Sequence, residues 1–146
     1  MNAYQTIALQ QDGAVAHVAF ARPERANAFN GTSWRELGAV MQWADATPGV
    51  RAVVLSGQGK HFTAGIDLAF LQAMQAEIAP LGPGRREERL LQIILELQAT
   101  VAAIECCRKP VLTAIHGACV GGGIDISSAC DLRFAAASAR FAVKDR

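Results

Sequence analysis

A strand followed by a glycine-bearing loop and a helix occurs twice in this sequence, and this repeated order constrains the fold more than any other feature. The first unit begins with the apolar run at residues 51–55, and the second begins with the run at residues 111–115. A loop containing glycine follows each run, and a stretch with helical spacing of apolar residues comes after it. Strands that alternate with helices in this way predict an α/β fold.

The other elements follow from apolar periodicity and turn residues. Two strands are expected at 6–9 and 14–20, around the turn Gln11-Asp12-Gly13, and a last strand at 132–136. The expected helices cover 33–46, 67–78, 85–104 and 122–129.

Two of these helices carry more detailed expectations. Thr32 or Ser33 is placed to cap the first helix, and Glu36 stands at capping-box spacing from Ser33. The charge run at 85–89 is interpreted as the solvated first turn of the long helix, with a specific anion site there as the alternative. The expected core face of that helix consists of Leu90, Leu91, Ile94, Leu97, Val101 and Ile104.

Composition indicates one globular domain. The chain has 146 residues, of which 51% are hydrophobic and 18% charged, and its net charge is +1. These values exclude a disordered chain and argue against nucleic-acid or membrane-surface partners. No apolar stretch reaches the roughly 18 residues that a membrane span needs. Because the N-terminus lacks the pattern of a secretory or transit signal, we expect a cytoplasmic protein.

The four cysteines predict neither a metal site nor a redox motif. Cys106, Cys107, Cys119 and Cys130 lack the paired spacing of zinc ligands and form no C-x-x-C. We therefore expect reduced, mostly buried thiols.

The two glycine-bearing loops, residues 61–68 and 115–125, are the candidates for chemistry. Each is expected to end where a helix begins, and helix starts carry unpaired N–H groups and a partial positive charge. Two such ends directed at one point would make an anion site from backbone alone, and Gly65 and Gly121 would let a ligand approach closely. The alternative is that the glycines only permit tight packing. Neither loop fits a P-loop or a dinucleotide fingerprint.

Three segments resemble motifs of the enoyl-CoA hydratase/isomerase (crotonase) family. Residues 62–68, FTAGIDL, resemble its F-x-[AS]-G-x-D-[LI] segment. Residues 114–131 resemble its A-x-x-G-x-x-x-G-G-G-x-[ED]-x-x-x-x-C-D block, and residues 22–28, RPERANA, resemble the R-P-x-x-x-N-A stretch that lines the CoA site. The match runs in order from about residue 5 to the end. It implies a crotonase-like α/β spiral of repeated β-β-α units, here lacking the C-terminal helical part.

The resemblance also implies roles for particular residues. The N–H groups of Ile66 and Gly122 would form an oxyanion hole that binds the thioester oxygen and stabilises an enolate. Asp125 and Asp145 stand where the family has its first and second catalytic acids. The residues implied around the CoA substrate are Arg25, Ala26, Ala28, Ala64, Gly65, Asp67, Leu68 and Gly121. Coenzyme A is part of the substrate, and no separate cofactor or metal is implied.

Aspartate at position 125 looks most like the dienoyl-CoA isomerase branch, whose members shift a conjugated pair of double bonds during fatty-acid β-oxidation. Asp145 is one methylene shorter than the glutamate of that branch, and a third acid would fall beyond Arg146. A 2-enoyl-CoA hydratase is the alternative activity, and a non-catalytic acyl-CoA-binding module is the alternative of another class. The serine-protease branch of this fold is disfavoured, because the chain contains no G-x-S-x-G.

Chains of this family are roughly twice as long as this one. Residues 1–146 are therefore expected to be the N-terminal crotonase core, which is the CoA-binding and oxyanion-hole half, without the C-terminal trimerisation region. The full-length protein would be a homotrimer or a dimer of trimers.

The remaining conspicuous residues are interpreted as structural. His17, His61 and His116 match no catalytic position of the family. Asp131 is expected to fix a turn, and Trp34 and Trp43 are expected to pack the first helix.

Overall fold

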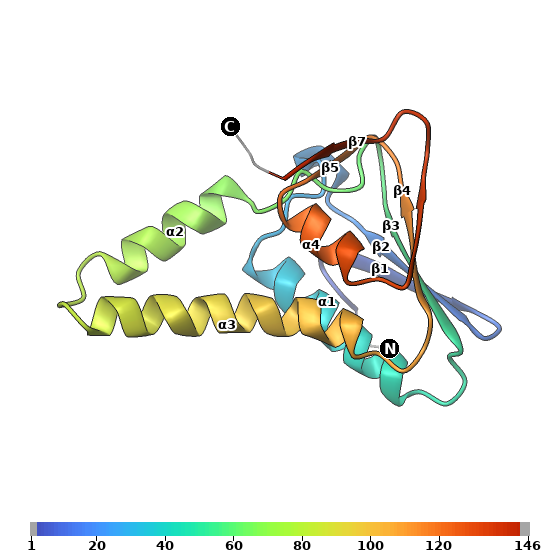
Figure 1. Ribbon diagram of the computed structural model, residues 1–146, viewed down its shortest axis with the longest axis horizontal. Helices are drawn as coiled ribbons and strands as arrows, with labels where there is room; N and C mark the ends of the chain where they lie inside the picture. The colour runs from blue at the N-terminus through green and yellow to red at the C-terminus, as the bar shows by residue number, and fades with distance from the viewer. Residues whose placement is uncertain (1–2, 144–146) are drawn as a thin grey trace.

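The computed structural model describes residues 3–143 and shows a mixed sheet with helices packed beside it (Figure 1). The elements are β1 (Ile7–Asp12), β2 (Val15–Phe20), the 3-10 helix η1 (Pro23–Arg25), α1 (Gly31–Ala46), β3 (Ala52–Gly57), α2 (Leu68–Ile78), α3 (Arg85–Glu105), β4 (Val111–Ile115), β5 (Ala118–Val120), α4 (Gly122–Ser128), β6 (Leu132–Ala135) and β7 (Arg140–Ala142). The predicted α/β class is confirmed.

The main sheet has the strand order β1-β2-β3-β4-β6. β1 and β2 pair antiparallel as a hairpin, whereas β2, β3, β4 and β6 pair in parallel. β5 and β7 form a separate two-stranded parallel sheet that the sequence did not predict as such. Since the carboxyl ends of parallel strands meet at one edge, the loops after β3 and β4 emerge side by side.

The core lies between the sheet and α1. Ala16 and Val18 of β2 stand opposite Val53 and Leu55 of β3, and all four side chains are fully buried. Helix α1 contributes buried side chains at helical spacing, which are Trp34, Leu37, Val40, Met41 and Ala44.

The start of α1 and the first turn differ from prediction. The side chain of Asn30, rather than Thr32 or Ser33, caps α1 by accepting a hydrogen bond of 2.9 Å from the N–H of Ser33. Glu36 forms no capping box, because its carboxylate accepts bonds from the N–H and hydroxyl groups of Thr6. The β1–β2 turn is also tighter than expected, since β1 continues to Asp12.

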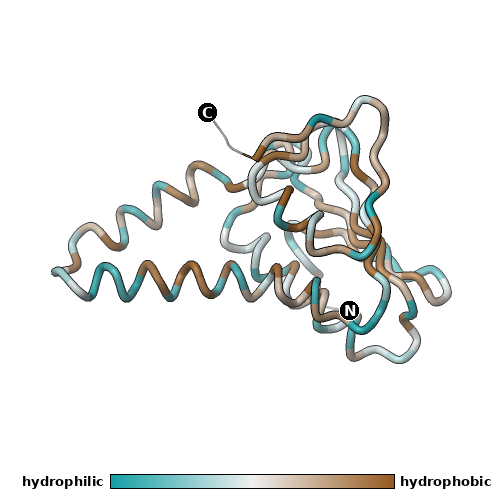
Figure 2. The backbone as a smooth tube through the Cα atoms, viewed as in Figure 1, coloured by the Kyte–Doolittle hydropathy of each residue, from teal (hydrophilic) through white to brown (hydrophobic). Residues whose placement is uncertain are grey.

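Helices α2 and α3 form an arm that projects from the sheet (Figure 1). The predicted core face of α3 is wrong in its first half, where Leu90, Leu91 and Ile94 are 41%, 56% and 41% exposed. Apolar segments alternate with polar ones along this arm (Figure 2). Its outer part lies beyond the sheet, so only the second half of α3, ending at the buried Ile104, reaches the core.

Polar contacts also join the two helices of the arm to each other. Arg89 of α3 donates a hydrogen bond of 2.7 Å to Glu77 of α2, and Arg86 donates to the carbonyl groups of Ala79 and Leu81. Residues 85–88 of the charge run are exposed, as predicted for a solvated first turn, whereas Arg89 is half-buried against α2.

The cysteines are free, as predicted, but only two of them are buried. Cys119 and Cys130 are buried, whereas Cys106 is exposed and Cys107 is intermediate. Burial raises the pKa of the Cys130 thiol to about 12. None of the helices between residues 3 and 143 combines the length and apolarity needed to cross a membrane.

Candidate active site

Backbone hydrogen bonds hold the two glycine-bearing loops against each other. The N–H of Phe62 donates to the carbonyl of His116 at 2.8 Å, and the N–H of Thr63 donates to the carbonyl of Ala118 at 3.0 Å. In return, the Val120 N–H donates to the Thr63 carbonyl at 3.1 Å. The chain after β3 therefore runs alongside β5, and the two loops have a fixed separation.

The RPERANA segment joins the first loop from the other side. The Ala64 N–H donates to the Ala26 carbonyl at 2.9 Å. Further along, the Phe29 N–H donates to the Gly65 carbonyl at 2.8 Å, and the Asp67 N–H donates to the Phe29 carbonyl at 2.9 Å. All three motif segments identified in the sequence are therefore adjacent in space.

Asn27 connects these segments through its side chain, a role that the sequence analysis did not assign. Its Nδ2 donates to the carbonyl groups of Gln58 and His61 at 2.8 and 2.9 Å, and its Oδ1 accepts from the Arg22 N–H at 2.9 Å. The residue is 2% exposed and has a φ of +54°. Asparagine is among the few residues enriched in this left-handed region, and that preference is the sequence signal that could have indicated its position.

The histidines of the two loops are structural, as predicted. The ring nitrogen Nδ1 of His61 accepts a hydrogen bond of 3.1 Å from the Ala118 N–H. The Nε2 of His116 lies 2.7 Å from the Gly59 carbonyl oxygen. Both rings thus hold loops together.

Ile66 and Gly122 line one cavity of about 510 Å³, which is the candidate active site. Gly122 is the first residue of α4, whereas Ile66 lies two residues before α2 begins. Within residues 3–143, neither of their N–H groups donates a hydrogen bond to the protein. The glycine before each donor sets its direction, because Gly65 and Gly121 have φ values of +91° and +53° that other residues rarely adopt.

Asp125 lines the same cavity from the first turn of α4. The structure therefore brings together three of the four residues that the sequence analysis assigned to catalysis. The fourth, Asp145, lies outside the described residues. Glu105, at the end of α3, adds a carboxylate to the cavity wall that the sequence analysis missed. The sequence pattern that could have indicated Glu105 is its spacing of four residues from Val101 and eight from Leu97, which places all three on one helix face.

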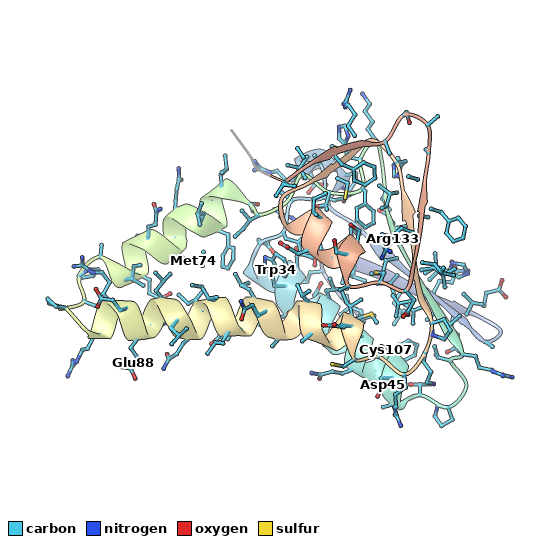
Figure 3. All side chains as sticks on the ribbon, viewed as in Figure 1. Trp34, Asp45, Met74, Glu88, Cys107 and Arg133 are labelled. Carbon is cyan, nitrogen blue, oxygen red and sulfur yellow. The ribbon has the colours of Figure 1, made fainter. Side chains whose placement is uncertain are left out.

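Trp34 of α1, labelled in Figure 3, lines the cavity in addition to packing the helix as predicted. Its ring atoms Cζ2 and Cη2 lie 3.2 Å from the position where a Cβ on Gly122 would stand. A glycine at 122 therefore allows the indole to approach the wall that carries the N–H group. The lining residues of the cavity are Trp34, Ile66, Leu97, Gln98, Val101, Ala102, Glu105, Gly122 and Asp125.

A second, more open cavity of about 470 Å³ lies where the RPERANA segment meets α1 and α2. Arg22, Arg25 and Arg35 line it, and Asp67 is the one acid in its lining among the residues that the structure describes. Its excess of positive charge suits an anionic ligand.

Asp67 is held in its charged form. Burial pushes the pKa of its carboxyl upward, but hydrogen bonds from Arg22 and from the Ala69 N–H, together with the Arg22 charge, outweigh burial and lower the pKa. Arg22 lies 3.1 Å from the carboxylate, and the bond to Ala69 caps α2.

Of the residues assigned to CoA by resemblance, Arg25 and Asp67 line this charged cavity. The others line neither of the two cavities described above, and they are Ala26, Ala28, Ala64, Gly65, Leu68 and Gly121. Four of them are engaged in the backbone arrangement: Ala26 and Ala64 bond to each other, and Gly65 and Gly121 direct the two donors. Leu68 is 66% exposed at the start of α2.

A family model for enoyl-CoA hydratase/isomerase matches residues 10–145 of this sequence. The chain belongs to this family. The family membership inferred from the three motifs is therefore confirmed.

Similar proteins support the branch that was expected. The peroxisomal Δ(3,5)-Δ(2,4)-dienoyl-CoA isomerase of Arabidopsis thaliana is 39% identical over 149 residues, which cover 99% of this chain and 54% of that protein. The mitochondrial enzyme of the same name from Mus musculus is 43% identical over 131 residues, covering 90% of this chain and 40% of that protein. This chain thus spans about half the length of the relatives that it matches.

A solved structure confirms the crotonase-like fold. The enoyl-CoA hydratase/isomerase of Xanthobacter autotrophicus superposes with a TM-score of 0.82 at 32% sequence identity. The superposition covers 95% of this chain and 49% of that chain.

Proposed function

We propose that this chain is the CoA-binding and oxyanion-hole half of an acyl-CoA isomerase that acts on 3,5-dienoyl-CoA thioesters in fatty-acid β-oxidation. The observation that carries the proposal is that Ile66 and Gly122 line one cavity, and that their N–H groups have no protein acceptor within residues 3–143. The dienoyl-CoA isomerases among its relatives support this choice of reaction.

The two N–H groups act on the thioester oxygen. When a carboxylate removes the proton from the carbon next to the thioester, the negative charge moves onto that oxygen and along the diene. Protonation at the far end of the diene then leaves each double bond one position closer to the thioester, as the change from a 3,5-diene to a 2,4-diene requires. Among residues 3–143 the cavity lining has two carboxylates, Asp125 and Glu105, and no cationic side chain, and the proposal assigns stabilisation of the charge to the backbone donors. In enzymes generally, losing one such donor costs about 10²–10³ in rate.

Asp125 is one of the two proton-transferring carboxylates in this proposal, and Asp145 is the other. Support for Asp125 comes from its place on the first turn of α4, on the wall that also carries Gly122. The role proposed for Asp145 rests on the family resemblance alone. No cofactor takes part, since the CoA moiety belongs to the substrate.

The charged cavity binds the CoA portion. Arg22, Arg25 and Arg35 supply positive charge for its phosphates, and Asp67 keeps the Arg22 side chain and the start of α2 in place. The segment 64–67 borders both cavities, since Ile66 lines one and Asp67 lines the other.

The proposal is tested by incubating the chain with a 3,5-dienoyl-CoA and following the ultraviolet absorbance of the 2,4-diene product. Asp125→Asn should lower kcat by about 10²–10⁴, the usual contribution of a general acid or base, while calorimetry shows unchanged binding of a CoA thioester. Asp12→Asn is the matched control, because Asp12 is an exposed carboxylate at the end of β1.

The other outcomes identify the alternatives. Addition of water to a 2-enoyl-CoA, without diene formation, would establish a hydratase instead. Binding of CoA thioesters by the full-length protein without any turnover would establish a non-catalytic acyl-CoA-binding module. An Asp125→Asn variant with full activity would remove Asp125 from the mechanism.

Assembly and compartment remain predictions. We propose that residues 1–146 are the N-terminal core of a longer protein that forms a homotrimer or a dimer of trimers. Apolar side chains exposed on β6, on β7 and directly after β7 support burial by further protein, and they are Leu132, Phe134, Phe141 and Val143. Light scattering on the full-length protein measures the assembly, and imaging of a tagged copy tests the predicted cytoplasmic location.

A further inference from the structure

Thr63 lies between the two candidate oxyanion donors and contacts the loop of each. It is fully buried. Its N–H and carbonyl groups bond to Ala118 and Val120 of the second loop, as described above. The side chain adds two further contacts, one through its hydroxyl group and one through its methyl group.

The hydroxyl group holds the peptide that directly precedes the one carrying the first donor. Its Oγ1 donates to the Asn27 carbonyl at 2.7 Å and accepts from the Gly65 N–H at 3.0 Å. The carbonyl of Gly65 in turn accepts from Phe29. Both ends of Gly65 are therefore fixed, and the next N–H along the chain, that of Ile66, has one direction.

The methyl group determines how closely the second donor approaches. A Cβ built on Gly123 would stand 2.6 Å from the Cγ2 of Thr63, so the backbone of α4 rests directly on this methyl group. Gly123 follows Gly122, whose N–H is the second donor. The distance between the loops at this point is thus set by one methyl group and one glycine.

We propose that Thr63 is a positioning residue that sets the direction of the Ile66 N–H through its hydroxyl group and the separation of the two donors through its methyl group. This inference rests on the proposed function, because it assumes that both N–H groups bind one thioester oxygen. It predicts that neither serine, which lacks the methyl group, nor valine, which lacks the hydroxyl group, replaces threonine fully.

The test compares Thr63→Val and Thr63→Ser in the chain, with Thr113→Val as the matched control. Thr113 is also fully buried, and within the described residues its hydroxyl group has no hydrogen-bond partner. Thr113→Val should therefore leave kcat unchanged. Thr63→Val should lower kcat about tenfold, below the limit of about 10²–10³ for complete loss of a donor, with KM changed less than twofold. Thr63→Ser should lower kcat by less than Thr63→Val.

A second readout does not depend on turnover. Infrared spectroscopy of a bound, isotope-labelled acyl-CoA reports polarisation of the thioester carbonyl as a shift of its stretching band to lower frequency. We expect a clear shift in the wild type, a smaller shift in Thr63→Val, and the wild-type shift in Thr113→Val. Absence of any shift in the wild type would refute the oxyanion hole itself. A wild-type shift that Thr63→Val reproduces in full would refute the role of Thr63 alone.

A paired substitution covers the case in which Thr63→Val does not fold. Gly123→Ala places its Cβ against the Thr63 methyl group, so we expect it to weaken the carbonyl shift and lower kcat. Combining it with Thr63→Ser removes the clash and should restore part of both. If the double variant is no better than Gly123→Ala, the methyl contact does not set the spacing.

Discussion

Replacing Asn27 by alanine removes three hydrogen bonds that join three segments of the chain. The amide group bonds to Gln58, His61 and Arg22 at 2.8–2.9 Å, and the side chain is almost completely buried. Water has little access to replace these bonds. The variant also places alanine at a φ of +54°, where its Cβ is unfavourable.

The stability that Asn27→Ala loses can be worked out from the hydrogen bonds and from the backbone conformation. A hydrogen bond of this kind contributes about 1 kcal/mol net, so the three together contribute about 3 kcal/mol to the free energy of unfolding. The left-handed backbone adds about 1 kcal/mol against alanine relative to glycine. Asn27→Ala should therefore lose about 3–4 kcal/mol, and Asn27→Gly about 1 kcal/mol less.

Urea unfolding, followed by circular dichroism, measures both losses. With an m-value of about 2 kcal/mol/M, Asn27→Ala should lower the unfolding midpoint by about 1.5–2 M. Asn30→Ala is the matched control, because it removes only the cap of α1 and should cost about 1 kcal/mol. If Asn27→Ala lowers the free energy of unfolding no more than Asn30→Ala does, the three hydrogen bonds do not contribute the stability assigned to them. If Asn27→Gly is no more stable than Asn27→Ala, the backbone argument fails.

Two further predictions concern stability. Gly117 and Gly13 have similar φ values, +59° and +56°, but a Cβ at 117 would lie 2.1 Å from the Lys60 carbonyl oxygen whereas a Cβ at 13 meets nothing within 4 Å. Thermal unfolding should therefore show that Gly13→Ala lowers the free energy of unfolding by about 1 kcal/mol. Gly117→Ala should lower it much more or give no folded protein, and equal losses for the two variants would contradict the steric argument. Because the folded-state pKa of Asp67 lies below its unfolded value of about 3.9, its carboxylate contributes stability above roughly pH 4 and loses that contribution as pH falls through the folded pKa. We expect urea unfolding from pH 7 to pH 3 to show that the difference in free energy of unfolding between wild type and Asp67→Asn narrows only below about pH 4. A difference independent of pH would show that ionisation of Asp67 does not contribute to stability.

The sequence predicted the elements well where the signal is local. Apolar runs located β3 and β4, and helical spacing located α1 to α4 within a few residues. The same spacing failed for the first half of α3, because periodicity shows which face of a helix is apolar but not whether another element covers it. Leu90 and Leu91 have the spacing of core residues and remain exposed on the arm.

The candidate site was predictable in part. Glycines before each candidate donor and the family motifs indicated Ile66, Gly122 and Asp125, and these three residues line one cavity. Trp34 and Glu105 were not assigned to the site, since they come from helices whose approach to α4 depends on tertiary packing. The sequence analysis included Asn27 only as one position of the R-P-x-x-x-N-A motif. Its hydrogen bonds could not be predicted, because its three partners lie in different segments of the chain.

What the sequence by itself determined is local: the alternation of strands and helices, the left-handed turns at glycine, and the motif order that assigns the family. These properties depend on backbone conformation and side-chain pattern within a few residues. The position of Ile66 and Gly122 at one cavity was decided only by the tertiary structure. It requires parallel strands to bring two loops to one edge of the sheet, and hydrogen bonds from Thr63 and Asn27 to hold them there. Such contacts join residues far apart in the chain, and no local pattern specifies them.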